Sequence, residues 1–109
     1  MTAVIQVSRT SKTLLTEYPK VLEWYSNLRR SSPSNADKCL QRLEQVRRTY
    51  NVTPTQLAKL SPTLAYSFIL RVVTDMDNAD KQPTYIQDFV KSLKSWFAHN
   101  GKQVSQKVT

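Results

Sequence analysis

The chain has 109 residues, 39% of them hydrophobic, and its 16 Lys and Arg outnumber 8 Asp and Glu, a formal net charge of +8 at pH 7. This length suits one domain with a modest core, and the hydrophobic fraction excludes both a disordered chain and a membrane protein. The basic excess favours a polyanionic partner, with nucleic acid ahead of anionic lipid.

Glycine and cysteine are each present once, as Gly101 and Cys39. A β-rich domain of this size needs several glycine-bearing turns, so the composition predicts an all-α fold. One cysteine excludes an intrachain disulfide and fits a reducing, cytoplasmic compartment. No segment has the pattern of a signal peptide or reaches the roughly 20 apolar residues of a membrane span, so we expect neither secretion nor a membrane partner.

For the N-terminal third of the chain, the sequence predicts a flexible lead-in followed by one helix. Residues 1–12 are polar and form the lead-in. The helix is expected over 16–30, with Thr16 as its cap and Pro19 in its first turn. Its apolar stripe consists of Val21, Trp24, Tyr25 and Leu28.

A second helix is expected over 35–50, after a loop at 31–34 whose last residue, Ser34, is the expected cap. Its apolar residues share one face at helical spacing: Ala36, Cys39, Leu40, Leu43, Val46 and Tyr50. This spacing predicts core, Cys39 included. The opposite face is polar and basic, and the acids Asp37 and Glu44 lie together at its edge.

Two cap-and-proline pairs follow. Thr53 is the expected cap of a short helix over 54–59, and Ser61 is the expected cap of a third long helix over 62–76, with proline as the first residue of each. The apolar residues of this long helix spread around much of its circumference, so we expect it to be the most buried helix. An acidic, solvated loop should follow it, with Asp75, Asp77, Asn78 and Asp80.

The fourth long helix is expected over 83–99 and ends at Asn100 and Gly101. Residues 102–109 then form a polar linker. We therefore expect one helical domain over 13–101, a compact bundle of four long helices and one short helix. Its single core should contain Leu40, Leu43, Phe68, Ile69, Val72, Phe89, Leu93 and Phe97.

Catalytic chemistry finds little support in this sequence. His99 is the only histidine, and we expect it to be a solvated residue at a helix end. A zinc site or a Ser-His-Asp arrangement needs more converging ligands, and a glycine-rich phosphate loop needs more than one glycine. The aspartates near residue 77 lack the glycine and glutamate of a calcium loop. We expect no enzymatic activity, no metal, no cofactor and no small-molecule ligand.

Two outward helix faces carry the functional prediction. Lys and Arg neutralise phosphates, and glutamine can reach base edges. A solvated charged face explains either one alone, but two in one basic chain favour duplex DNA. The aromatic residues could stack on single-stranded bases, but their helical spacing predicts core. The candidate DNA-binding residues are Lys38, Gln41, Arg42, Gln45 and Arg48 on the second helix, and Gln87, Lys91 and Lys94 on the last.

The order of helices and three segments resemble the N-terminal core-binding domain of phage-integrase-type tyrosine recombinases, over about residues 16–104. Residues 34–43, SNADKCLQRL, are similar to the start of that domain's second helix, S-x-x-T-x-x-x-Y-x-x-x-L. Asp37 and Cys39 stand near the positions where the family usually has Thr and Tyr.

The other two segments lie in the second half. Residues 57–62, LAKLSP, resemble the family's step from leucine through Ser or Thr into a helix. Residues 86–97, IQDFVKSLKSWF, resemble its last helix, T-I-x-x-x-L-S-A-L-R-x-F-F, with Lys94 near the Arg. Asn100 and Gly101 match its usual end.

This resemblance implies a SAM-like helical domain that forms half of a clamp on duplex DNA at the recombination core site. It also implies contacts with other recombinase protomers in a synaptic complex, and a nucleoid-associated location. The family's catalytic residues belong to a separate C-terminal domain, so none is carried over, and none of the five tyrosines is taken as the nucleophile.

Two alternatives remain open. A helix-turn-helix regulator would have a compact three-helix unit, and the broad apolar surface of the helix over 62–76 argues against its use as a recognition helix. A helical protein–protein adaptor would show no binding to duplex DNA at moderate salt.

Overall fold

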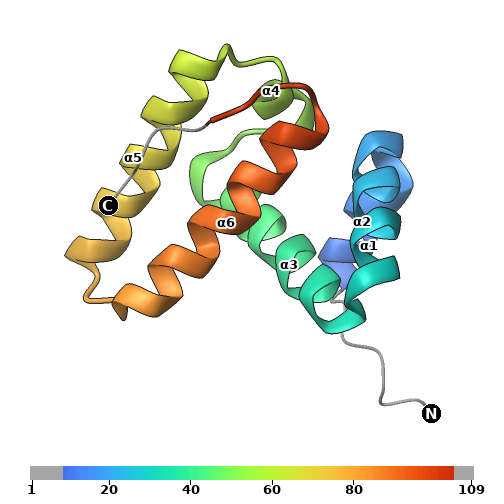
Figure 1. Ribbon diagram of the computed structural model, residues 1–109, viewed down its shortest axis with the longest axis horizontal. Coiled ribbons are helices and arrows are strands. Elements are labelled where there is room, and N and C mark those ends of the chain that lie inside the picture. The colour runs from blue at the N-terminus through green and yellow to red at the C-terminus, as the bar shows by residue number, and fades with distance from the viewer. Residues whose placement is uncertain (1–8, 105–109) are drawn as a thin grey trace. The chain divides into compact units, whose positions relative to one another are not determined.

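The computed structural model describes residues 9–104 and is helical throughout, with no strand in this range (Figure 1). The all-α prediction is therefore confirmed. The described residues form six helices rather than the five expected, and the additional one is the first. The helices are α1 (Arg9–Glu17), α2 (Pro19–Ser31), α3 (Pro33–Tyr50), α4 (Pro54–Ala58), α5 (Pro62–Asn78) and α6 (Pro83–His99).

The chain divides into two compact units after Thr55, within α4. In the first unit, α1 packs against both α2 and α3, and α2 packs against α3. In the second, α5 and α6 lie side by side and run in opposite directions (Figure 1). The residues predicted for a single core are thus divided between two units, with Leu40 and Leu43 in the first and the others in the second.

Helix α1 begins at Arg9, inside the predicted lead-in, whose residues 1–8 lie outside the described range. Thr16 belongs to this helix, where its hydroxyl donates to the Thr13 carbonyl at 3.0 Å, so the prediction that Thr16 caps the next helix is wrong. Leu14 is only 2% exposed. A nine-residue helix is marginal in isolation, and burial of this leucine supplies tertiary stabilisation that the local sequence does not show.

The cap of α3 is Ser32 rather than Ser34. The Ser32 backbone is extended, and the Ser32 hydroxyl accepts a hydrogen bond from the backbone N–H of Asn35 at 3.3 Å. Pro33 occupies the first turn, where its fixed φ suits a helix and its missing N–H costs no hydrogen bond. The link between α2 and α3 is therefore a single non-helical residue, shorter than the loop predicted over 31–34.

The ends of the second unit's helices match the sequence more closely. The Ser61 hydroxyl accepts from the Leu64 amide at 3.2 Å, which confirms the predicted cap of α5. Helix α6 has the predicted bounds, and Gly101 follows it with φ of +81°, a left-handed conformation that favours glycine. Of the predicted linker, residues 102–104 are described, and Val104 is buried.

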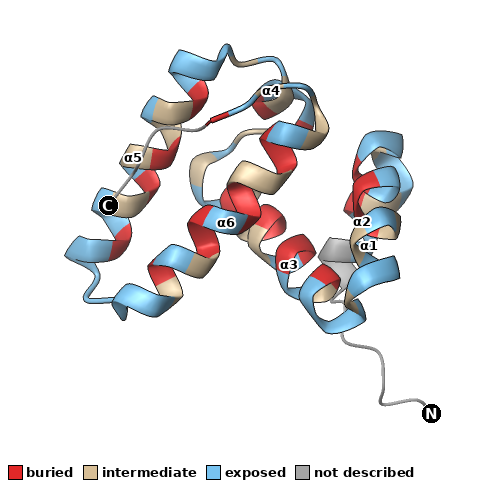
Figure 2. Cartoon of the chain, in the orientation of Figure 1, coloured by how far each residue is buried: buried red, intermediate tan, exposed pale blue. Residues whose placement is uncertain are grey.

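Burial is distributed differently from the prediction for the third long helix (Figure 2). Helix α5 buries four residues, Ala65, Ile69, Val72 and Met76, whereas α6 buries seven. Leu64 is 55% exposed, and Phe68 is half-buried rather than core. Helix α5 is thus not the most buried helix, and that prediction is wrong. An apolar sequence does not show which face of the helix meets a neighbour. The other seven predicted core residues are buried.

We expect Leu43→Ala in the first unit and Leu93→Ala in the second each to lower the free energy of unfolding by about 2–5 kcal/mol. Each side chain is 1% exposed, so its loss removes buried apolar area and leaves a cavity. Denaturant unfolding monitored by circular dichroism measures both changes. Leu22→Ala is the control: Leu22 is 47% exposed, and its truncation should cost no more than about 0.5 kcal/mol. A control as destabilised as the core variants would contradict this assignment.

Candidate nucleic-acid interface

Five of the candidate residues lie along one side of α3, and we call this surface the α3 face. At about 100° per residue they occupy about 120° of the helix circumference, over a length of about 15 Å. Three are exposed and two half-buried, and none is buried. The α3 face consists of Lys38, Gln41, Arg42, Gln45 and Arg48. A helix with such an exposed polar side has the dimensions that the major groove of DNA admits.

The first acid beside this face is held by a neighbouring helix. The Tyr25 hydroxyl on α2 donates a hydrogen bond of 2.6 Å to Oδ1 of Asp37. The Arg29 guanidinium lies over the Tyr25 ring, 5.9 Å from its centroid. The Asp37 carboxylate thus has a donor on α2, and this hydrogen bond links α2 to α3.

The second acid points into the protein instead of lying at the edge of the polar face. Glu44 is only 2% exposed. Arg47 donates to both of its oxygens, from Nε and Nη2, each at 2.8 Å. This hydrogen bond, with the charge of Glu44, raises the pKa of Arg47. The negative charge of Glu44 is therefore neutralised by Arg47, which sequence analysis did not consider although the spacing of i and i+3 allows the pair.

Both acids of α3 are thus engaged by side chains outside the α3 face. The five residues of the face contribute three cations and two amides. No carboxylate lies among these side chains, so the face itself carries a net positive charge.

The remaining three candidates form a second surface, the α6 face, on the other compact unit. Gln87, Lys91 and Lys94 follow one another at intervals of four and three residues, which aligns them along α6. Gln87 and Lys91 are exposed, and Lys94 is half-buried. Opposite them, α6 contributes its seven buried residues. The expectation that these side chains lie opposite the buried side of the helix therefore agrees with the structure.

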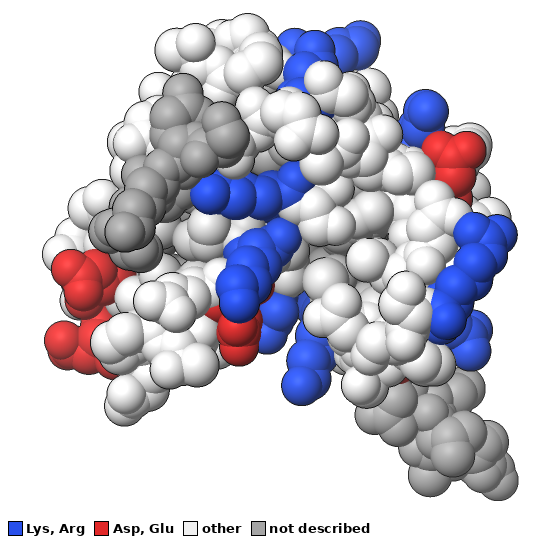
Figure 3. Space-filling model, viewed as in Figure 1, with Lys and Arg blue, Asp and Glu red and all other residues white. Residues whose placement is uncertain are grey.

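Acidic side chains of the second unit gather at one of its ends. On the side drawn in Figure 3, they lie where α5 turns into α6, whereas basic side chains lie over α6 with a further acidic side chain beside them. The sequence of α6 itself includes Asp88. The sequence places Asp75 and Asp77 in the last turn of α5 and Asp80 in the following turn, all exposed. The expected acidic loop is thus partly helical. This end of the unit would repel phosphates.

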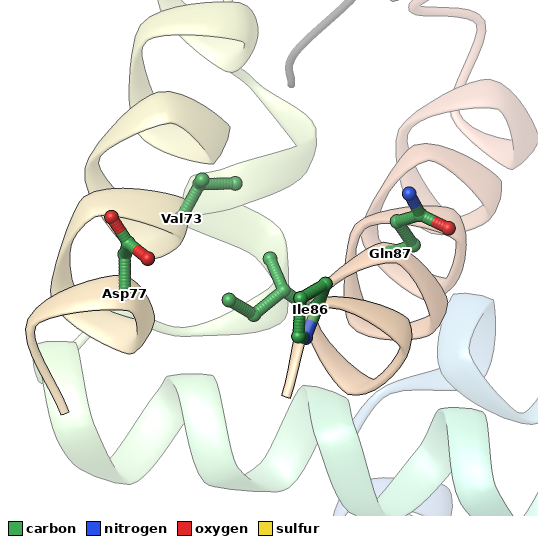
Figure 4. A pocket seen from close by; sticks show the side chains of 5 residues that line it. Val73, Asp77, Ile86 and Gln87 are labelled. Atoms are coloured by element: carbon green, nitrogen blue, oxygen red, sulfur yellow. The ribbon is translucent and has the colours of Figure 1, made fainter. Parts of the chain in front are cut away.

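A pocket of about 280 Å³ opens between α5 and α6 (Figure 4). Val73 and Ile86 point toward each other from the two helices, and Asp77 lies one turn beyond Val73 on α5. Pro83 and Gln87 complete the lining. The pocket offers alkyl groups, one carboxylate and the Gln87 amide but no cation, so it shares Gln87 with the α6 face and lacks that face's lysines.

His99 is half-buried and stacks against Trp96, with ring centroids 6.1 Å apart, so it is not the freely solvated residue expected. Within residues 9–104, no group of three or more His, Cys, Asp or Glu side chains is arranged to hold a metal ion. No helix of this range has the length and apolar character needed to span a membrane.

Both tryptophans and two of the three phenylalanines are core, as their spacing predicted. Trp24, Trp96, Phe89 and Phe97 are each at most 2% exposed. They offer no surface on which bases could stack. Cys39 is also buried, as expected.

Comparisons of the chain with models of known families, with curated proteins and with solved structures find no match.

Burial, followed by the hydrogen bond to Asp37, raises the pKa of Tyr25 above its ordinary value of 10.0. The folded state therefore holds this phenolic proton more tightly than the unfolded state. The stabilisation is complete below the unfolded pKa and is lost as the pH rises through the folded pKa. We expect Tyr25→Phe to cost about 1 kcal/mol at neutral pH and to weaken the alkaline loss of stability. Denaturant unfolding at a series of pH values tests this, and an unchanged alkaline profile in the variant would contradict it.

Proposed function

We propose that this protein binds duplex DNA through the α3 face, with the α6 face as a second contact surface. The observation that carries the proposal is that none of the cations and amides of the α3 face is buried, while both acids of α3 are engaged by side chains outside this face. Asp37 accepts from Tyr25, and Glu44 is buried against Arg47. Lysine and arginine would release counterions from the phosphates, and the glutamines would reach base edges.

We further propose that the chain acts as the core-binding domain of a site-specific tyrosine recombinase, clamping DNA at the recombination core site. The resemblance of residues 34–43 and 86–97 supports this, and those segments fall on α3 and α6, the two helices with candidate faces. The SAM-like bundle, the partner protomers in a synapse and the nucleoid association belong to the same proposal.

A helix-turn-helix regulator is the second candidate, and α5 would have to be tested as its recognition helix. The exposure of Leu64 and of much of α5 removes the earlier argument that this helix is too buried to bind DNA. The charges of α5 give a better argument against its use as a recognition helix. Arg71 is the only cation of α5, and Asp75 and Asp77 lie in its C-terminal part, so phosphate contacts favour α3 instead.

Titration of a labelled duplex at several salt concentrations tests the DNA proposal. We expect Lys38→Ala with Arg48→Ala on the α3 face to weaken binding. If both side chains contact phosphates, the log–log salt slope should fall by about 2, because each contact contributes about 0.9. Lys91→Ala with Lys94→Ala measures the α6 face separately.

Lys20→Ala with Lys59→Ala is the matched control, since it removes two charges, one from each unit. Lys20 is exposed and lies 3.6 Å from Glu23, and Lys59 is exposed. This control should keep the wild-type slope. Equal losses in all three double variants would reduce the proposal to non-specific attraction by net charge. A wild-type protein that binds no duplex at low salt would favour the protein–protein adaptor.

The same proposal predicts that this chain alone forms no covalent bond to DNA, because the residues that cleave DNA in the family belong to another domain. Incubation with a nicked suicide substrate, followed by denaturing electrophoresis, should show no shifted band. A covalent adduct on any of Tyr18, Tyr25, Tyr50, Tyr66 or Tyr85 would overturn the assignment of a purely DNA-binding role.

A further inference from the structure

We infer that Arg29 on α2 is an additional phosphate-binding residue, which extends the α3 face beyond its N-terminal end. This inference rests on the proposed binding of duplex DNA and names a contact that the sequence-predicted site omits. It concerns the DNA backbone and not the bases, because an arginine at the margin of a groove-binding helix meets the phosphates that line the groove.

The hydrogen bond between Tyr25 and Asp37 defines where Arg29 lies. Asp37 precedes Lys38 along the chain and lies at the edge of the α3 face, about 20° from Arg48 around the helix. Because only Ser32 separates α2 from α3, residues after Tyr25 on α2 approach the N-terminal end of α3. Arg29 lies one helical turn after Tyr25 and on the same side of α2. It therefore lies toward the N-terminal end of α3, beyond the edge of the α3 face that Asp37 occupies.

Contact with an aromatic ring holds the Arg29 side chain in this position. Its guanidinium carbon lies 5.9 Å from the centroid of the Tyr25 ring, within the range of a cation–π interaction. The ring is itself held by the bond of its hydroxyl to Asp37. A guanidinium that lies over a ring still has N–H groups that can bind a phosphate in a bidentate manner. Arg29 is exposed, so a phosphate can reach it.

Arg30 provides a matched comparison within the same turn. It has the same charge and is also exposed, but it points about 100° further around the helix. Its Nη1 donates to Oδ1 of Asn27 on the same helix, so the partner of the Arg30 guanidinium is not the Tyr25 ring. Arg29→Ala and Arg30→Ala thus remove the same charge from neighbouring positions and differ in the direction and the partner of the side chain.

The test titrates a fluorescently labelled duplex with wild type, Arg29→Ala, Arg30→Ala and Arg29→Lys between about 50 and 200 mM salt. We expect Arg29→Ala to weaken binding several-fold and to lower the log–log salt slope by about 0.9. Arg30→Ala should keep the wild-type slope. Arg29→Lys should retain most of the slope but less affinity, because lysine keeps the charge and loses the planar contact with the ring. Thermal unfolding checks that every variant is folded.

Equal losses in Arg29→Ala and Arg30→Ala would overturn the inference, since net charge alone would explain them. Wild-type affinity and slope in Arg29→Ala would overturn it as well. In both cases duplex binding by wild type would leave the proposed function intact. If wild type binds no duplex at low salt, the proposed function fails, and the contact of Arg29 with phosphate fails with it.

Discussion

The position of proline is the constraint on which the rest of this structure depends. The chain has five prolines, and each is the first residue of a helix: Pro19, Pro33, Pro54, Pro62 and Pro83. A proline disfavours the helical conformation in the residue before it, and its ring provides the φ that the next helix needs. Five of the six described helices therefore begin where covalent geometry requires it. Each helix then runs from this start to its C-terminal cap, and the helical repeat of 3.6 residues decides which side chains share a face.

Hydrogen bonds between side chains then determine the charge that α3 presents. Its sequence contains acids as well as bases, so its composition alone indicates a mixed surface. Tyr25 and Arg47 bind the two carboxylates and leave the cations of the α3 face accessible. The helix is thus divided into a side committed to internal pairing and a basic side. This division gives the proposal of DNA binding a structural basis that net charge cannot provide.

Helix α5 shows the limit of an apolar pattern. Its sequence is apolar around most of its circumference, yet only four of its residues are buried, and Leu64 is largely exposed. Helix α6 has a clear division between apolar and polar sides, and it buries seven. A stripe identifies the side that faces a core, because the polar residues beside it must reach water. A helix that is apolar on all sides has no polar residues to identify its exposed side, and the packing of its neighbours decides which residues are buried.

The sequence by itself determined the helical class, the helix starts at Pro54, Pro62 and Pro83, the cap at Ser61 and the bounds of α6, because proline, serine and glycine act on the backbone next to them. It also determined which residues share the α3 and α6 faces, because helical periodicity is local. Only the tertiary structure decided that α1 forms, since a short helix depends on the burial of Leu14. It likewise decided that Glu44 is buried and that Arg29 rests on Tyr25, because those contacts require packing of side chains that local backbone preferences do not specify.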